Sequence, residues 1–171
     1  MRTAVRALLI VGLVSAASCT ESGTGVVDLP AGEFTASVSG NVDADYSGTA
    51  YLYEGDSFIP GRRLVLTTHD NGAEITIWGG GLLTDGTDFD FQVGKRSIGI
   101  LTDVQADFTL SPYTTVGQMY IATDGTLRVT SSTAAQVVGE FEFDGLVNLP
   151  DGSKRQARVS GQFHAVPGPE F

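Results

Sequence analysis

The tightest group of chemistry-capable side chains is acidic and lies in the segment DGTDFD, which contains Asp85, Asp88 and Asp90. Carboxylate oxygens are the ligands that Ca²⁺ prefers, and a calcium site needs several of them at once. The segment lacks the D-x-[DN]-x-[DN]-G order and the distal Glu of an EF-hand loop. Asp88 and Asp90 also alternate with Phe89 and Phe91, as the solvent face of a strand does. The three aspartates are candidate calcium ligands, and a solvated strand face is the explanation that we favour.

The two histidines, His69 and His164, offer no catalytic constellation. We expect both near strand ends. Asp70 follows His69 directly, but neighbouring residues of a strand point to opposite faces, so the two cannot act as base and orienter. The zinc-binding spacings His-x-x-x-His and Cys-x-x-Cys are absent from the chain. The sequence therefore predicts no catalytic residue, no cofactor and no enzyme activity.

Three aromatic residues, Tyr51, Tyr53 and Trp78, are candidate ligand-binding residues. The two tyrosines share one face of a predicted strand, and the apolar residues beside them share the other. Trp78 precedes a run of three glycines, where the backbone can bend or lie open to a ligand. Sugar-binding β domains use such rings as stacking platforms, but burial in the core, the explanation that we favour, accounts for the same rings at least as well. Both explanations stay open, and the expected ligand is a protein or a carbohydrate.

The only cysteine, Cys19, follows two arginines, a short apolar run and a stretch of small residues. It can form no disulfide within the chain, and this layout is typical of a secretion signal. The apolar run, residues 7–14, is far shorter than the roughly 20 residues that span a bilayer as a helix. We therefore expect residues 1–18 to be a signal peptide.

The segment Ala16-Ala17-Ser18-Cys19 resembles the lipobox of bacterial lipoproteins, with Ala16 in the place where Leu is usual. The resemblance implies that Cys19 is diacylated, becomes the mature N-terminus and tethers the protein to the cell envelope, at the outer membrane or the cell surface. The alternative is an ordinary signal peptide cut after Ala17, which would leave a free thiol in an oxidising compartment. Residues 19–32, rich in Gly, Ser, Thr and acids, are expected to form a flexible tether.

Period-two alternation of apolar and polar residues dominates residues 33–171. In FTASVSGNV, apolar Phe34, Ala36 and Val38 alternate with Thr and Ser, as a strand with one buried face requires. Similar alternation recurs in SGTAYLYE, RLVLTTH, AEITIW, DFDFQV, ADFTL, MYIAT, TLRVTS, VVGEFEF and QARVSGQFHAV. No window of comparable length carries the stripe of an amphipathic helix. We therefore predict one all-β domain of roughly ten strands.

Turn chemistry supports antiparallel pairing of these strands. Asn71-Gly72, Asp124-Gly125 and Asp151-Gly152 separate predicted strands, and such dipeptides favour the positive φ angles of tight hairpin turns. The 22 glycines of the chain suit a turn-dense fold. An antiparallel β-sandwich and a small β-barrel are both compatible with these patterns.

A second resemblance lies in the C-terminal half. The succession GTLRVT, GEFEF and VSGQF is similar to the ending of a group of uncharacterised bacterial lipoproteins with small all-β domains. The resemblance implies secretion and an all-β fold, and it implies no activity. Within the second motif, Phe141 and Phe143 share one strand face and Glu140 and Glu142 share the other, so we expect both phenylalanines to be buried.

Charge restricts the partners of this chain. The formal net charge is −10, and loss of residues 1–18, which contain two arginines and no acid, changes it to −12. So acidic a chain repels nucleic-acid phosphates, and nucleic acid is excluded as a partner. The expected function is that of a membrane-anchored, extracytoplasmic binding or structural interaction module. The alternative is a cell-envelope hydrolase whose active site is assembled only in the fold.

Overall fold

The computed structural model describes residues 28–55, 61–69, 72–80, 89–110 and 119–169, and these residues contain no helix. They form nine strands: β1 (Glu33–Gly40), β2 (Ala44–Tyr53), β3 (Arg63–Thr68), β4 (Glu74–Gly79), β5 (Gly94–Ile98), β6 (Val104–Thr109), β7 (Met119–Ser132), β8 (Val137–Asn148) and β9 (Lys154–Pro167). The all-β class predicted from period-two alternation is confirmed.

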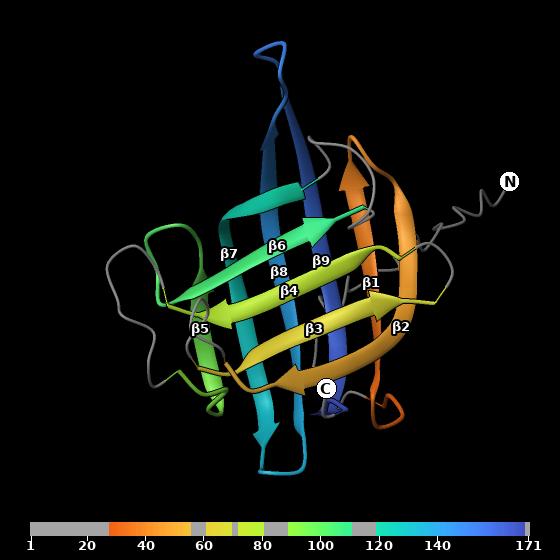
Figure 1. Cartoon of the computed structure of the whole chain (residues 1–171), viewed down its shortest axis with the longest axis vertical. Coiled ribbons are helices and arrows are strands. Elements are labelled where there is room, and N and C mark those ends of the chain that lie inside the picture. Colours follow the sequence, from red (N-terminus) through yellow and green to blue (C-terminus); the bar gives the residue numbers. More distant parts are fainter. Residues whose placement is uncertain (1–27, 56–60, 70–71, 81–88, 111–118, 170–171) are drawn as a thin grey trace, which may run out of the picture.

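The strands form one sheet in the order β1-β2-β3-β4-β6-β5-β7-β8-β9, which closes on itself because β1 also pairs with β9. Figure 1 shows that the closed sheet is flattened into two layers, with β3, β4 and β6 running across the front and β1, β8 and β9 running steeply behind them. Neighbouring strands are antiparallel except for two short parallel pairings, β5 with β6 and β2 with β9. The sequence left open a β-sandwich and a small β-barrel, and the sheet of this structure closes on itself as that of a barrel does.

Strands β2 and β7 each cross from one layer to the other, and so connect the two layers. β2 pairs first with β1 and then with β3, and β7 leaves β6 to continue beside β8. The hairpin predicted at Asp124-Gly125 is wrong, because both residues lie inside β7, next to a register shift that begins at Ala122. A Cβ at Gly125 would lie 2.6 Å from the Cβ of Phe143, so close pairing requires glycine here. The dipeptide marks a bulged bend in a continuous strand.

The hairpin predicted at Asp151-Gly152 is confirmed. It joins β8 to β9, Gly152 has a φ of +83°, and the Ser153 N–H donates to Asp151 Oδ1 at 2.9 Å. β3 and β4 likewise form the antiparallel pair expected around Asn71-Gly72, where Gly72 has a φ of +66°. Asn71 itself lies outside the described residues. Both glycines occupy the left-handed region that other residues avoid.

The strand predicted in DFDFQV is wrong for its described residues, 89–93, which join no ladder. Their backbone bonds locally instead: the Phe91 N–H donates to the Asp90 carboxylate at 2.8 Å, and the Gln92 N–H donates to the Asp90 carbonyl at 2.9 Å. Such local bonds of an Asp side chain compete with strand pairing. Strand β5 begins directly afterwards and was missed, because Ile98 is its one buried residue.

The interior is filled by inward aliphatic and aromatic side chains, and the predicted burial of Phe141 and Phe143 is confirmed at 3% and 1% exposure. Glycines face these rings from neighbouring strands. A Cβ at Gly161 would lie 2.7 Å from the Phe141 ring, and one at Gly139 would lie 2.8 Å from the Phe163 ring. The rings therefore cover glycine backbone, which explains why glycines and phenylalanines occur together in GEFEF and VSGQF.

Candidate functional site

The two tyrosines of β2 lie on the outside of the closed sheet. Ala50 and Leu52, which alternate with them, are 0% and 4% exposed and point into the core. Tyr51 and Tyr53 are half-buried on the opposite side of the strand, and their rings meet edge to face with centroids 6.3 Å apart. Such an arrangement is favourable for aromatic pairs. Burial in the core, the explanation that we favour from the sequence, is therefore wrong for both tyrosines.

Trp78 joins the tyrosines on this side of the sheet. The strand register places Arg63 of β3 between Tyr53 of β2 and Trp78 of β4. The guanidinium carbon of Arg63 lies 5.7 Å from the centroid of the Tyr53 ring, within the range of a cation–π interaction. Trp78 is half-buried and its neighbour Ile77 is fully buried, so the indole faces outward. The structure thus brings Tyr51, Tyr53 and Trp78 onto one outer face.

Two carboxyl groups, Glu74 of β4 and Asp107 of β6, lie on the same face. Asp107 is directly opposite Thr76, and Glu74 is two residues from Thr76 along β4. The Thr76 hydroxyl donates to Glu74 Oε1 at 3.2 Å. Burial, and to a smaller extent the charge of Glu74, raises the pKa of Asp107 to about 7. Asp107 therefore keeps its proton to a much higher pH than an ordinary Asp does, while it faces a carboxylate.

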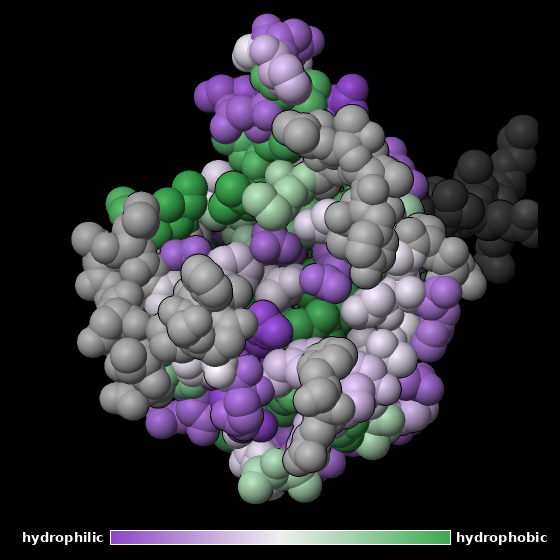
Figure 2. All heavy atoms as spheres, viewed as in Figure 1, coloured by the Kyte–Doolittle hydropathy of each residue, from purple (hydrophilic) through white to green (hydrophobic). Residues whose placement is uncertain are grey.

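These outward groups are close enough to act on one another. Burial and the charge of Tyr51 raise the pKa of Tyr53, Arg63 opposes the rise, and Glu74 adds to it. Figure 2, which views this side, shows pale and purple residues over much of its described centre, around one green patch, with further green hydrophobic residues toward the margins. We call this surface the aromatic face, and define it by the outward residues Tyr51, Tyr53, Arg63, Glu74, Thr76, Trp78 and Asp107.

Sequence analysis did not single out Glu74 and Asp107. The alternation in ADFTL was a usable signal, because it places Asp107 on the polar side of its strand, between buried Ala106 and Phe108. Parity, however, does not say which strand lies alongside. β4 and β6 are paired although β5 lies between them in the sequence, so no hairpin turn pointed to this pair of carboxyl groups.

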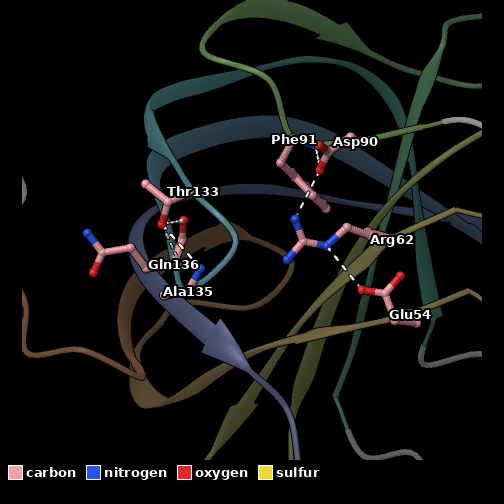
Figure 3. A network of polar contacts seen from close by, with 7 residues as sticks. All are labelled: Glu54, Arg62, Asp90, Phe91, Thr133, Ala135 and Gln136. Carbon is pink, nitrogen blue, oxygen red and sulfur yellow. Dashed lines mark hydrogen bonds and ion pairs between the residues drawn. The ribbon is translucent and has the colours of Figure 1, made fainter.

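The described residues do not assemble the candidate calcium site. Asp85 and Asp88 lie outside them. Asp90 Oδ1 accepts a hydrogen bond from Arg62 Nη1 at 3.0 Å, and Arg62 Nε lies 3.6 Å from Glu54 Oε1. Figure 3 shows Arg62 reaching between these two carboxylates. Through Arg62, Asp90 therefore links the segment before β5 to Glu54, just after the end of β2. No group of three or more metal-ligating residues occurs in the described ranges.

Neither histidine lies in a catalytic arrangement among the described residues. His69 is exposed and directly follows β3. His164 lies in β9, three residues before the strand ends at Pro167, and its Nδ1 and Nε2 lie 2.8 Å from the Leu29 carbonyl oxygen and from Gln136 Oε1. A backbone hydrogen bond to the same strand fastens the turn before β1. Residues 29–32, assigned to the tether from the sequence, are thus docked on the domain.

A polar groove of about 1110 Å³ lies on the outside of the rear layer, over β1, β7, β8 and β9, and residues of β2 and β5 complete its lining. Several of its charged side chains are engaged in ion pairs: Arg128 Nη1 lies 3.2 Å from Glu140 Oε1, and Glu142 Oε2 lies 3.0 Å from Nη2 of the neighbouring Arg158. Of its two aromatic lining residues, Phe141 belongs to the core and Tyr46 packs against it. A ligand would have to compete with these pairs, so the aromatic face is the stronger candidate site.

Cys19 and the rest of residues 1–27 lie outside the described part of the chain, so lipid attachment at Cys19 stays a prediction. No helix among the described residues has the length and hydrophobicity needed to cross a membrane. The first strand, β1, begins at Glu33, where the sequence placed the start of the domain.

Comparisons with known proteins gave no relative. No family model matches the chain, and neither the curated proteins nor the solved structures include a significant match. Function must therefore be inferred from the residues and geometry of this chain.

Proposed function

We propose that this protein is an exported, lipid-anchored carbohydrate-binding protein without catalytic activity, and that its ligand stacks on the aromatic face. One observation carries the proposal: Tyr51, Tyr53 and Trp78 lie together on the outside of the sheet, while the interior is filled without them. Aromatic rings gathered outside a filled core are a common mark of a binding surface.

A neutral sugar suits the chemistry of this face. The C–H faces of a pyranose ring are apolar and pack on aromatic rings, and the hydroxyl groups at its edge bond to charged side chains. Here Arg63 supplies donors, and Glu74 and Asp107 supply acceptors, on the same side of the same strands. The formal net charge of −10 disfavours anionic ligands. A neutral oligosaccharide is therefore the proposed ligand class.

The proposed location rests on the N-terminal sequence. A diacylated Cys19 would hold the protein firmly in a membrane, since two acyl chains bind far more tightly than one. Leu29, ten residues after Cys19, contacts His164 and thus belongs to the folded domain. A ten-residue tether spans at most roughly 35 Å. The aromatic face would then meet saccharides close to the envelope surface.

Trp78 makes the proposal directly testable, because it is the only tryptophan of the chain. The lipoprotein, solubilised in a detergent without sugar groups, is titrated with cello-, chito- and malto-oligosaccharides while tryptophan emission is recorded. We expect a saturable change with at least one of these probes. Tyr53→Ala should weaken binding roughly tenfold, the loss of about one aromatic contact.

Gln162→Ala is the matched control, because Gln162 lines the polar groove of the rear layer. It should bind as the parent does. If no probe changes the emission of folded protein, or if Gln162→Ala loses binding while Tyr53→Ala keeps it, the proposed role of the aromatic face is wrong.

One observation favours a second function, hydrolysis in the cell envelope. Asp107 keeps a proton up to neutral pH beside Glu74, because burial and this charge raise its pKa to about 7, and acid–base pairs of glycosidases are tuned in the same way. Product analysis separates the two functions. Recovery of intact oligosaccharide supports binding alone, and cleavage that is lost in Asp107→Asn would make the protein a hydrolase.

A further inference from the structure

Within the described ranges, Asp107 has few charged neighbours. On β4 its direct partner is Thr76, with Glu74 on the adjacent diagonal. On β7 its partner is the exposed apolar residue Ile121. Arg63 lies on β3, beyond β4, where its guanidinium group covers a tyrosine ring of β2. Among the described residues, Glu74 is thus the charge that acts on Asp107.

We propose that Asp107 is the hydrogen-bond donor that sets the specificity of the aromatic face. Protonated Asp107 and the Glu74 carboxylate together bind two adjacent hydroxyl groups of a neutral sugar, and binding weakens when Asp107 loses its proton. This inference rests on the proposed carbohydrate-binding function and assigns a role to residues that lie beside its aromatic rings.

A carboxyl and a carboxylate offer complementary hydrogen bonds. The Glu74 carboxylate can only accept, and one of its oxygens already accepts from Thr76 at 3.2 Å. Protonated Asp107 donates through its O–H and accepts through its C=O. Two adjacent sugar hydroxyls match this pair, because one can donate to Glu74 while the other accepts from Asp107. A sugar that lacks either hydroxyl would leave a half-buried polar group unpaired, which costs more than the loss of a contact alone.

The surroundings of Asp107 make this donor sensitive to pH near neutrality. Burial is the main cause that raises its pKa to about 7, and the charge of Glu74 is the second. Once Asp107 is ionised, the donor is lost and two negative charges face each other across β4 and β6. The affinity for a neutral sugar should therefore be constant well below pH 7 and fall as the pH rises through that value.

The test repeats the Trp78 titrations with the same cello-, chito- and malto-oligosaccharides at about pH 6 and about pH 8.5. For the parent protein, the dissociation constant should rise roughly tenfold between the two, because only the protonated form makes every bond. Asp107→Asn keeps a neutral donor and should bind equally at both pH values. Asp45→Asn removes the same charge from the rear layer and should keep the pH dependence of the parent.

Each outcome decides something. Binding by the parent that is equal at both pH values, or pH dependence that persists in Asp107→Asn, overturns this inference and leaves carbohydrate binding intact. No response at either pH overturns the proposed function, and this inference with it. A second test needs no saccharide: the carboxyl ¹³C resonance of Asp107 is followed as the pH is changed. Its midpoint should lie near pH 7. A midpoint of about 4, the usual value for Asp, overturns the inference.

Discussion

A carboxyl group that prefers to keep its proton in the folded state weakens that state once the proton must leave. The pKa of Asp107 rises from 3.8 to about 7 on folding. Its cost is therefore absent below about pH 4, grows between the two values and is complete above about pH 7. Asp107→Asn should raise the free energy of unfolding by on the order of 2 kcal/mol at about pH 8.5, discounted for partial solvent exposure, and by little at about pH 4.

Urea unfolding at the two pH values measures this effect. Asp45→Asn serves as the control, because Asp45 is exposed in the rear layer and its removal should change stability little. Equal stabilisation by Asp107→Asn at both pH values would contradict the raised pKa of Asp107.

Phe141 tests the core at the same scale. Its side chain is 3% exposed, its ring centroid lies 6.4 Å from that of Phe163, and its ring covers Gly161. Phe141→Ala should lower the free energy of unfolding by about 3–5 kcal/mol, through lost burial and the cavity left behind. The neighbouring exposed residue offers a control, Glu142→Ala, which should cost below about 1 kcal/mol. A denaturant midpoint unchanged in Phe141→Ala would contradict the packing.

Residue parity explains which parts of the site could be predicted. Side chains alternate between faces whatever strand lies alongside, so the sequence separated Tyr51 and Tyr53 from Ala50 and predicted a buried Phe141. The diagonal placement of Glu74 beside Asp107 depends on strand neighbours that the sequence does not order. For this reason the rings were candidates from the start, and the carboxyl pair emerged only in the fold.

At the scale of strands, prediction failed where backbone conformation and local hydrogen bonds, and not the side-chain pattern, determine whether a strand forms or continues. β7 was read as two strands, because Asp-Gly is typical of turns, but a bulge lets the strand bend from β6 toward β8. DFDFQV was read as a strand, but Asp90 bonds its own backbone neighbours. β5 has too little apolar alternation to be recognised. The other segments have long alternating patterns and were found.

The two Asp-Gly pairs should respond differently to the same substitution. Gly152 has a φ of +83° and open space where a Cβ would lie, so Gly152→Asn should cost below about 1 kcal/mol, since Asn tolerates this conformation. At Gly125 a new Cβ would meet Phe143 Cβ at 2.6 Å, and Gly125→Asn should cost about 1–3 kcal/mol. Urea unfolding of both variants measures the difference. Equal costs would argue against a bulged strand at Gly125.

At the scale of the whole molecule, the β8–β9 hairpin and the start of β1 lie at opposite ends of the closed sheet. Figure 1 shows the β8–β9 hairpin extending past one end of the sheet, whereas β1 begins at the other. The register agrees, because Glu33 pairs with His164 and the hairpin lies beyond Ala157, the partner of Gly40. A chain anchored at Cys19 would therefore enter the domain at the end away from the hairpin.

Membrane fractionation tests the anchor. Cys19→Ala should move the protein from the membrane fraction to the soluble fraction, because acyl chains on Cys19 would supply the hydrophobic attachment. Ser18→Ala keeps a small residue before the cysteine and should remain membrane-bound. Recovery of Cys19→Ala in membranes after a high-salt wash would contradict lipid anchoring at this residue.

The proposed role of the aromatic face is tested most directly by mapping a bound oligosaccharide with NMR. The saccharide that gives the largest Trp78 response is added to isotope-labelled protein, and the side-chain resonances of both outer faces are followed. We expect saturable shifts for Tyr51, Tyr53, Trp78 and Asp107, and constant resonances for Gln162 in the polar groove of the rear layer. Saturable shifts confined to the polar groove, or no shifts at either face, would contradict carbohydrate binding at the aromatic face.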